Sequence, residues 1–233
     1  MFKNQMLTLV LPAYNEKEAV NDVISGHMGL GIIDEVVVVD NNSTDGTGEI
    51  ALKLGARVVK EQKQGYGHAC IRGLKEAGGD LIILIECDGT FMPEDVNKLL
   101  PYIENYDMVI GSRVNKDLNH PGANMDWIIR YGNFALGKTM EIFYPGDFKL
   151  NDVGCTFRII KKTALEKFIG KLRIGGEDFT PELTFEALKS GAKIIQVPIS
   201  YQPRIGKSKL SPDRFHSIRI GLKHLFHIIS RRP

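Results

Sequence analysis

The stretch DLIILIECDGTFMPED, residues 80–95, decides the fold class of this chain. Its apolar run, residues 81–85, stops abruptly at ECDGT, residues 86–90, as a buried strand does when it delivers acidic side chains to the edge of a sheet. In open α/β sheets, ligands bind at the carboxyl ends of the strands. Glu86 and Asp88 suit a hard divalent cation, which proteins commonly hold with one or two carboxylates and substrate phosphates. A solvated acidic turn before a helix has the same pattern, so both interpretations stay open.

Two earlier apolar runs also end in polar clusters. MLTLVL (residues 6–11) leads into PAYNE (12–16), and VVVV (36–39) leads into DNNSTDGT (40–47). We expect Pro12 to end the first strand, because proline cannot donate to a central ladder, and Asn15 to cap the helix that follows. Three such clusters at the edge of one sheet predict a nucleotide-type site there.

The remaining pattern alternates between strands and helices. Further strands are expected at residues 58–59 and 108–110, and helices at 15–24, 47–54, 68–77 and 93–102. This order predicts an α/β fold, Rossmann-like, with a mostly parallel sheet and helices on both faces. Neither a Walker lysine motif nor G-x-G-x-x-G follows the first strand, so side chains and a metal would hold a nucleotide. Asp40 is then expected to accept from a ribose or base, and Asp88 to reach the metal and diphosphate.

Composition narrows the class of protein. The 233 residues are 43% hydrophobic and 25% charged, which is ordinary for a soluble globular protein. A net charge of only +2 gives no field that would attract nucleic acid, so no nucleic-acid partner is expected. Cys70, Cys87 and Cys155 form neither a zinc nor a disulfide pattern, which fits a reducing cytoplasmic compartment. The apolar run at the N-terminus is too short for a signal peptide, and no stretch approaches the ~20 apolar residues of a spanning helix.

The C-terminal segment differs from the rest of the chain. Residues 203–233 hold eight lysines and arginines but one acid, Asp213. An apolar stripe runs through Phe215, Ile218, Leu222, Leu225 and Ile229. We therefore expect residues 1–210 to form the main domain and residues 211–233 a basic amphipathic helix. Such a helix lies on an anionic membrane surface, where each basic residue contributes about 1 kcal/mol, or docks on its own domain. Residues 125–143 form a second amphipathic segment, packed on the core or at a membrane interface.

Several of these motifs resemble those of a known family. PAYNE (12–16), VVVDNNSTDGT (37–47), the acidic turn (86–88) and GSR (111–113) resemble family 2 glycosyltransferases with the GT-A fold, over essentially the whole chain. DVGCTFR (152–158) and VPISYQPRIGKSKL (197–210) are similar to the dolichyl-phosphate mannose synthase branch. That resemblance implies metal-dependent, inverting transfer of a hexose from a GDP-mannose or UDP-glucose type donor to dolichyl or polyprenyl phosphate. It also implies a cytoplasmic protein, peripheral at the inner face of the membrane.

The resemblance also assigns roles to residues. Asp88 would ligate Mg²⁺ or Mn²⁺, supported by Glu86, which stands where the family usually has aspartate. Arg113 would face a phosphate, and Arg204 and Lys209 would clamp phosphates from the C-terminal side. The nucleotide pocket would contain Pro12, Tyr14, Glu16, Val39, Asp40, Asn42, Cys87 and Thr90.

The acceptor separates the remaining alternatives. An acceptor phosphate is already anionic, whereas a sugar hydroxyl needs a base within hydrogen-bond reach. Glu177-Asp178 resembles the acidic pair from which hydroxyl-using relatives draw that base, so Asp178 is a candidate catalytic residue. We favour polyprenyl phosphate because GKSKL (206–210) and the basic C-terminal helix suit it. A nucleotide-sugar-binding protein without turnover is the alternative outside the enzymes, and the missing glycine fingerprint disfavours an NAD-dependent enzyme.

Overall fold

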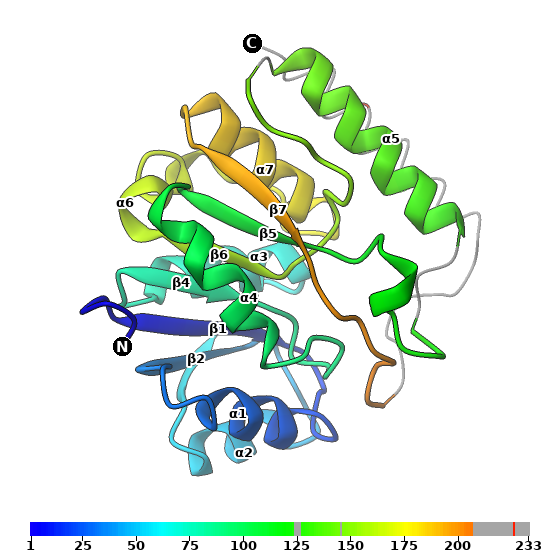
Figure 1. The fold of residues 1–233 in the computed structure, drawn as a ribbon. Coiled ribbons are helices and arrows are strands. Elements are labelled where there is room, and N and C mark those ends of the chain that lie inside the picture. The colour runs from blue at the N-terminus through cyan, green and yellow to red at the C-terminus, as the bar shows by residue number, and fades with distance from the viewer. Residues whose placement is uncertain (124–126, 145, 207–225, 227–233) are drawn as a thin grey trace.

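One sheet organises the described part of the chain. The computed structural model describes residues 1–123, 127–144, 146–206 and 226. Within them, a seven-stranded sheet has the order β3-β2-β1-β4-β6-β5-β7 (Figure 1). The strands are β1 (Leu7–Ala13), β2 (Glu35–Asp40), β3 (Arg57–Lys60), β4 (Leu81–Leu84), β5 (Met108–Ser112), β6 (Arg158–Lys161) and β7 (Ile194–Pro198).

Strand direction decides which loops share an edge. β1, β2, β3 and β4 run parallel to one another, as do β5 and β7, whereas β6 is antiparallel to its neighbours β4 and β5. The chain therefore enters β6 at the edge where it leaves β1, β2 and β4. The predicted mostly parallel α/β sheet is confirmed.

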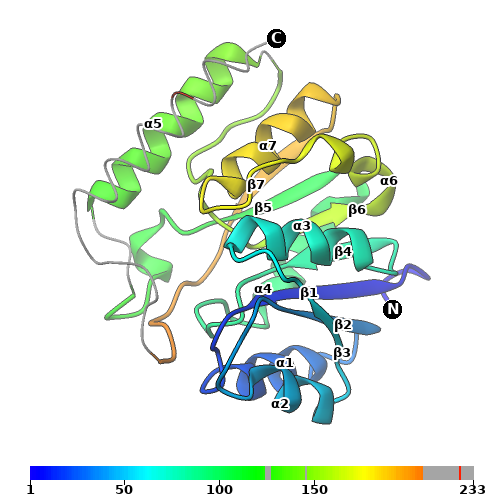
Figure 2. The same cartoon turned by 180° about the vertical axis from the view of Figure 1, so that it is seen from behind.

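Helices cover both faces of this sheet. They are α1 (Val20–Met28), α2 (Thr47–Lys53), α3 (Tyr66–Glu76), α4 (Asp95–Leu99), α5 (Trp127–Phe143), α6 (Lys162–Leu165) and α7 (Phe179–Lys189). α4 lies in front of the sheet in Figure 1 and α3 behind it, as the reverse view in Figure 2 shows. α3 approaches the sheet closely at Gly73, where an added Cβ would lie 2.3 Å from Val10 Cγ1 and 2.9 Å from Val39 Cγ2.

Two expectations about the end of β1 were wrong. β1 does not stop before Pro12 but continues to Ala13, with Pro12 opposite Val39. The ladder to β4 has already ended at Val10, so on that side the missing amide of Pro12 interrupts no pair. Asn15 caps no helix: it lies at φ 54°, and α1 begins later, at Val20.

The helix expected at residues 93–102 is shorter and later. α4 begins at Asp95 and gives way to a 3₁₀ segment, Leu100–Glu104. Pro101 explains the change, because it lacks the amide proton that an α-helix needs at that position.

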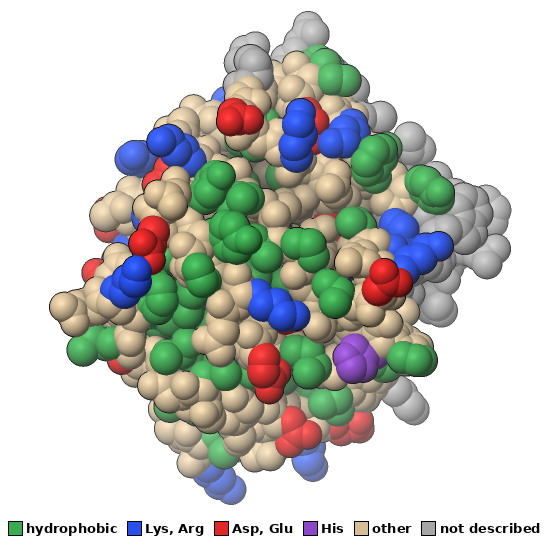
Figure 3. Space-filling model, in the orientation of Figure 1, with side chains coloured by type: hydrophobic (Ala, Val, Ile, Leu, Met, Phe, Trp, Pro, Cys, Tyr) green, Lys and Arg blue, Asp and Glu red, His purple; other side chains and the backbone are tan. Residues whose placement is uncertain are grey.

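The second amphipathic segment is a helix, as predicted. α5 lies at the outer edge of the molecule, beyond β7 (Figures 1 and 2). Leu136 and Met140 face the core, whereas Tyr131, Phe134 and Ile142 are exposed. Figure 3 shows hydrophobic side chains at the surface in this region, next to lysine and arginine.

Some expectations concern residues that the structure does not describe. The predicted C-terminal helix, 211–233, lies outside the described residues apart from Phe226, and so does Lys209. The domain boundary after residue 210 stays a prediction. Among the described residues, no helix is both long and apolar enough to cross a membrane.

Candidate active site

The polar clusters after β1 and β2 form one scaffold. The amide of Asn15 donates to Ser43 Oγ at 3.0 Å, and the amide of Glu16 to Thr47 Oγ1 at 2.9 Å. In return, Asn15 Oδ1 accepts from the amide of Thr44 at 2.8 Å. These bonds fix the backbone around Glu16 at the carboxyl edge of the sheet.

Arg204 connects that scaffold to the acidic turn after β4. Its Nη1 donates to Asp88 Oδ2 at 2.9 Å, and its Nη2 donates to Glu16 Oε1. Burial by itself lowers the pKa of Arg204, but Asp88 and Glu16 raise it overall. One guanidinium thus lies between two carboxylates that come from different strand ends.

Asp88 is held on its other side by its own turn. Its Oδ1 accepts from the amide and hydroxyl of Thr90 at 3.0 and 2.7 Å, and Asp88 is only 5% exposed. Thr90 therefore orients the carboxylate.

The segment around Arg204 is bound to the same turn. Gln202 donates from its amide to Thr90 O at 3.1 Å and from Nε2 to Gly89 O at 2.7 Å. The amide of Ile205 donates to Asp88 O at 2.9 Å. Gly89 has φ +77°, and a Cβ there would lie 2.6 Å from Ile205 Cδ1, so glycine permits both the turn and the close approach.

Glu86 occupies a separate position in the acidic pair. Its Oε1 accepts from Thr156 Oγ1 at 2.9 Å, and that hydroxyl lies 2.6 Å from Tyr66 OH. Burial and the nearby charge of Asp88 raise the pKa of Glu86 to about 7, against opposing effects of Arg113, Thr156 and Arg204. Glu86 as a whole residue is half-buried, beside the buried Asp88.

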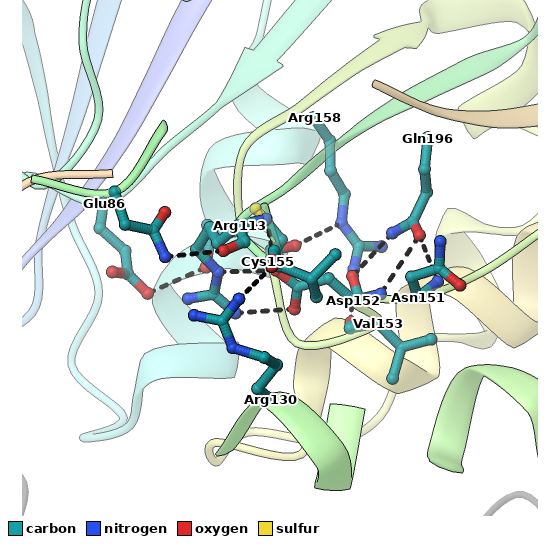
Figure 4. Close-up of polar contacts among 12 residues, drawn as sticks. Glu86, Arg113, Arg130, Asn151, Asp152, Val153, Cys155, Arg158 and Gln196 are labelled. Carbon is teal, nitrogen blue, oxygen red and sulfur yellow. Dashed lines mark hydrogen bonds and ion pairs between the residues drawn. The ribbon is translucent and has the colours of Figure 1, made fainter. Parts of the chain in front are cut away.

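Arg113 pairs with Asp152. Its Nε and Nη2 donate to Asp152 Oδ2 and Oδ1 at 2.8 and 2.9 Å, and its amide donates to Oδ2 at 2.9 Å (Figure 4). The guanidinium also lies over the Tyr201 ring, 5.2 Å from its centroid. Burial acts to lower the pKa of Arg113, but Asp152 raises it overall. The structure thus gives Arg113 a buried protein partner, and its contact with a phosphate stays a prediction.

A second buried arginine fixes the segment before β6. Arg158 donates to the carbonyls of Val153 at 3.1 Å and Cys155 at 3.2 Å (Figure 4). It also donates to the carbonyl of Thr180 at 2.9 Å. Burial lowers its pKa to about 10. It therefore joins the loop that carries Thr156 to the first turn of α7.

Asp178 lies at the start of that helix and is only 2% exposed. The preceding glycines meet the start of α3: the amide of His68 donates to Gly175 O at 3.2 Å. A Cβ at Gly67 would lie 2.1 Å from Ile174 O, so these two segments touch through their backbones.

Some residues predicted to line the nucleotide pocket are buried in the fold. Asp40 is 1% exposed; its Oδ1 accepts from the Ser43 amide at 2.8 Å, and its Oδ2 pairs with Lys60. Burial raises the pKa of Asp40, but Lys60 and Ser43 lower it overall. Asp40 thus supports the loop from beneath, and its contact with a ribose or base stays a prediction.

The other predicted pocket residues divide by exposure. Pro12, Val39 and Cys87 are buried, whereas Tyr14 is 40% exposed and Asn42 is also exposed, with its Nδ2 donating to Gln62 O at 3.0 Å. A ligand can reach the side chains of Tyr14 and Asn42 without a change in the fold.

Sequence reasoning gave no role to Asp152, Thr156 or Tyr66, which hold the arginine and glutamate of the site. One signal was present: DVGCTFR (152–158) places Asp152, Thr156 and Arg158 just before the apolar pair Ile159-Ile160. Without the antiparallel strand β6, nothing in the sequence indicates that this loop meets the acidic turn.

The acidic residues fit a divalent cation only in part. Among the described residues, no three His, Cys, Asp or Glu side chains form a group that would hold a metal by itself. Glu16 and Asp88 nevertheless converge on one cation, the guanidinium of Arg204. Two carboxylates completed by substrate phosphates are a usual environment for Mg²⁺, so the residues fit a metal that arrives with a diphosphate.

Solved structures share this fold. One is glucosyl-3-phosphoglycerate synthase from Mycobacterium tuberculosis, in complex with Mn²⁺, uridine diphosphate and glucosyl-3-phosphoglycerate. Its TM-score is 0.72 at 22% identity, covering 98% of this chain and 80% of that one. The fold is therefore the GT-A fold of glycosyltransferases.

The family follows from sequence comparison. Residues 8–169 match the model of glycosyl transferase family 2, and the chain belongs to this family of glycosyltransferases. It is 34% identical to glycosyltransferase AglJ of Haloferax volcanii over 84% of this chain and 63% of that protein. It is 30% identical to a dolichyl-phosphate hexose transferase of the same organism, over 88% of this chain and 87% of that one. The chain thus spans less than two thirds of the length of AglJ.

Proposed function

We propose that this glycosyltransferase moves a hexose from a nucleoside-diphosphate sugar, of the GDP-mannose or UDP-glucose type, to dolichyl or another polyprenyl phosphate. A phosphate oxygen of the acceptor attacks the anomeric carbon while the bond to the leaving diphosphate breaks, which inverts that carbon. The similarity to a dolichyl-phosphate hexose transferase supports this acceptor.

The burial of Asp178 carries the choice of acceptor. A hydroxyl acceptor needs a base that reaches its proton, and the candidate for that role is only 2% exposed at the start of α7. A phosphate acceptor needs no such base, because its attacking oxygen is already charged. The observed geometry therefore favours the phosphate over the hydroxyl.

The residues at the sheet edge would stabilise the leaving group. Asp88 and Glu16 would hold Mg²⁺ or Mn²⁺, which supplies positive charge against the diphosphate. Arg204 and Lys209 would contact phosphate oxygens. Thr156 and Tyr66 would hold Glu86 beside the metal without requiring it as a ligand.

A lipid acceptor requires contact with a membrane surface. Tyr131, Phe134 and Ile142 expose 66%, 46% and 77% of their surface along α5. Together with the basic residues after position 203, they support peripheral attachment to the cytoplasmic face of a membrane.

A hydroxyl or small phosphorylated acceptor is the second candidate. The structural neighbour described above holds glucosyl-3-phosphoglycerate, a product in which the acceptor is small. In that case Asp178 would act as base after a movement of the loop that precedes α7. A protein that binds nucleotide sugars without turnover is the remaining alternative.

The test is transfer of labelled sugar. The protein is incubated with Mn²⁺, polyprenyl phosphate and, in separate reactions, radiolabelled GDP-mannose, UDP-glucose and UDP-N-acetylglucosamine. We expect label in the lipid phase with one donor, its loss in Asp88→Ala, and its retention in Asp178→Asn. Transfer to added saccharides or phosphoglycerate that disappears in Asp178→Asn, with no lipid product, contradicts the proposal.

A further inference from the structure

The position of Arg204 has a consequence for how the metal site fills. Its guanidinium donates to both Glu16 and Asp88, and these two carboxylates are the ones assigned above to the divalent cation. Arginine and metal therefore compete for the same oxygens. A metal ion that arrives alone must displace a cation that the protein already supplies.

The carboxylates of Glu16 and Asp88 need a positive charge beside them, because both are largely shielded from water. Asp88 is 5% exposed, and the side chains of Glu16 and Arg204 are 11% and 24% exposed. Removing the guanidinium would leave two largely desolvated negative charges facing each other, which is unfavourable at low dielectric. The arginine thus stabilises the site while no metal is bound.

The same arginine is not fully satisfied in this position. Its Nε is buried and donates to no group among the described residues. A buried donor without a partner costs free energy, and phosphate oxygens accept charge-assisted hydrogen bonds from arginine well. A diphosphate entering the site would therefore provide what Glu16 and Asp88 do not.

We propose that Arg204 is the resting counter-ion of the cation site. It holds Glu16 and Asp88 until a divalent cation and a diphosphate enter together; the metal then takes the carboxylates and Arg204 takes the phosphate oxygens. This inference rests on the proposed donor site but not on the identity of the acceptor. It assigns the order of filling: metal alone binds weakly, and nucleotide and metal bind cooperatively.

The experiment measures binding of Mn²⁺ by titration calorimetry, first alone and then in the presence of UDP or GDP. The variants are Arg204→Gln and a matched control, Arg57→Gln. Arg57 also bridges two carboxylates, Glu35 and Glu76, but does so at the surface, at the start of β3. Arg57→Gln should bind Mn²⁺ as the wild type does.

We expect Arg204→Gln to bind Mn²⁺ alone about tenfold more tightly than the wild type, since a charge-assisted bond is worth that order of affinity. The enhancement of Mn²⁺ affinity by the nucleotide should be smaller in this variant. Arg204→Lys keeps the positive charge but cannot bridge both carboxylates. Its affinity for Mn²⁺ alone should therefore lie between those of the wild type and Arg204→Gln. This variant also replaces Arg204→Gln in the test if that protein does not fold. The inference is overturned if Arg204→Gln and Arg204→Lys both bind Mn²⁺ alone no more tightly than the wild type does.

The assay contains neither a sugar donor nor a lipid, so its outcome is separate from that of the transfer experiment. Failure to form lipid product with the expected Mn²⁺ behaviour removes the polyprenyl-phosphate acceptor and leaves the counter-ion intact. Lipid product combined with unchanged Mn²⁺ affinities in both Arg204 variants keeps the polyprenyl-phosphate acceptor and removes the counter-ion role of Arg204.

Discussion

Removing Asp152 should destabilise the protein strongly, because it would leave Arg113 buried without its partner. The pair makes three hydrogen bonds of 2.8 to 2.9 Å, and the side chain of Asp152 is fully buried. Breaking such a pair from one side typically costs about 3–5 kcal/mol, most of it the penalty of an uncompensated charge. We therefore expect Asp152→Ala to lower the free energy of unfolding by that amount, measured by urea denaturation followed by circular dichroism.

Removing both partners should cost much less. Asp152→Leu combined with Arg113→Met removes both charges, and the remaining cost is that of the amide at position 113, which loses its acceptor Asp152 Oδ2 and costs about 1–3 kcal/mol. Arg57→Met, which breaks a half-exposed pair, should change stability by less than about 1 kcal/mol. A decrease of less than about 1 kcal/mol in the unfolding free energy of Asp152→Ala would refute the reasoning, since a buried charge without a partner destabilises a fold by more than that.

The double variant also tests the role that the resemblance gives to Arg113. If Arg113 contacts a phosphate of the donor, the stable double variant binds UDP or GDP with Mn²⁺ more weakly than the wild type. If its role is confined to holding Asp152, nucleotide affinity stays unchanged.

Three other substitutions test local packing and one ion pair. Gly67→Ala places a Cβ 2.1 Å from Ile174 O and should cost about 1–3 kcal/mol in thermal or urea unfolding; Gly132→Ala, with open space around it, should stabilise by up to about 1 kcal/mol. Lys60→Met should move acid unfolding to higher pH, because the lowered pKa of Asp40 gives stability that is lost as pH falls through that pKa, and removing Lys60 raises it. An unchanged midpoint in a pH titration of the circular dichroism signal contradicts the assigned pair.

The sequence predicted the first half of the fold well because β1, β2 and β4 are almost entirely buried. Runs such as residues 36–39 and 81–85 contain only apolar side chains, and each ends at a polar cluster, so their direction and edge follow from the strand-end rule. The end of β1 was predicted too early because proline was expected to interrupt a central strand, whereas pairing with β4 has already ended at Val10, before Pro12.

The second half was harder for a physical reason. β6 is four residues long and begins with a buried arginine, Arg158, that contacts carbonyls and no carboxylate within hydrogen-bond distance among the described residues. Neither length nor polarity marks such a segment as a central strand. Missing β6 hid the contact of Thr156 with Glu86 in the acidic turn and that of Asp152 with Arg113 after β5, since both residues lie in the segment that enters this strand. The acidic turn was found, but its partners were not.

Because β6 runs in the opposite direction, sequence changes on its side of the site are separated from changes in the loops after β1, β2 and β4. Sequence that follows β1, β2 and β4 builds the side of the edge with Glu16 and Asp88, whereas sequence that precedes β6 reaches Glu86 from the other side through Thr156. A substitution or insertion before β6 therefore alters the surroundings of Glu86 without lengthening any loop that carries Glu16 or Asp88. Among the described strands, the framework that carries Glu16 and Asp88 can therefore stay constant while the segment that enters the antiparallel β6 changes.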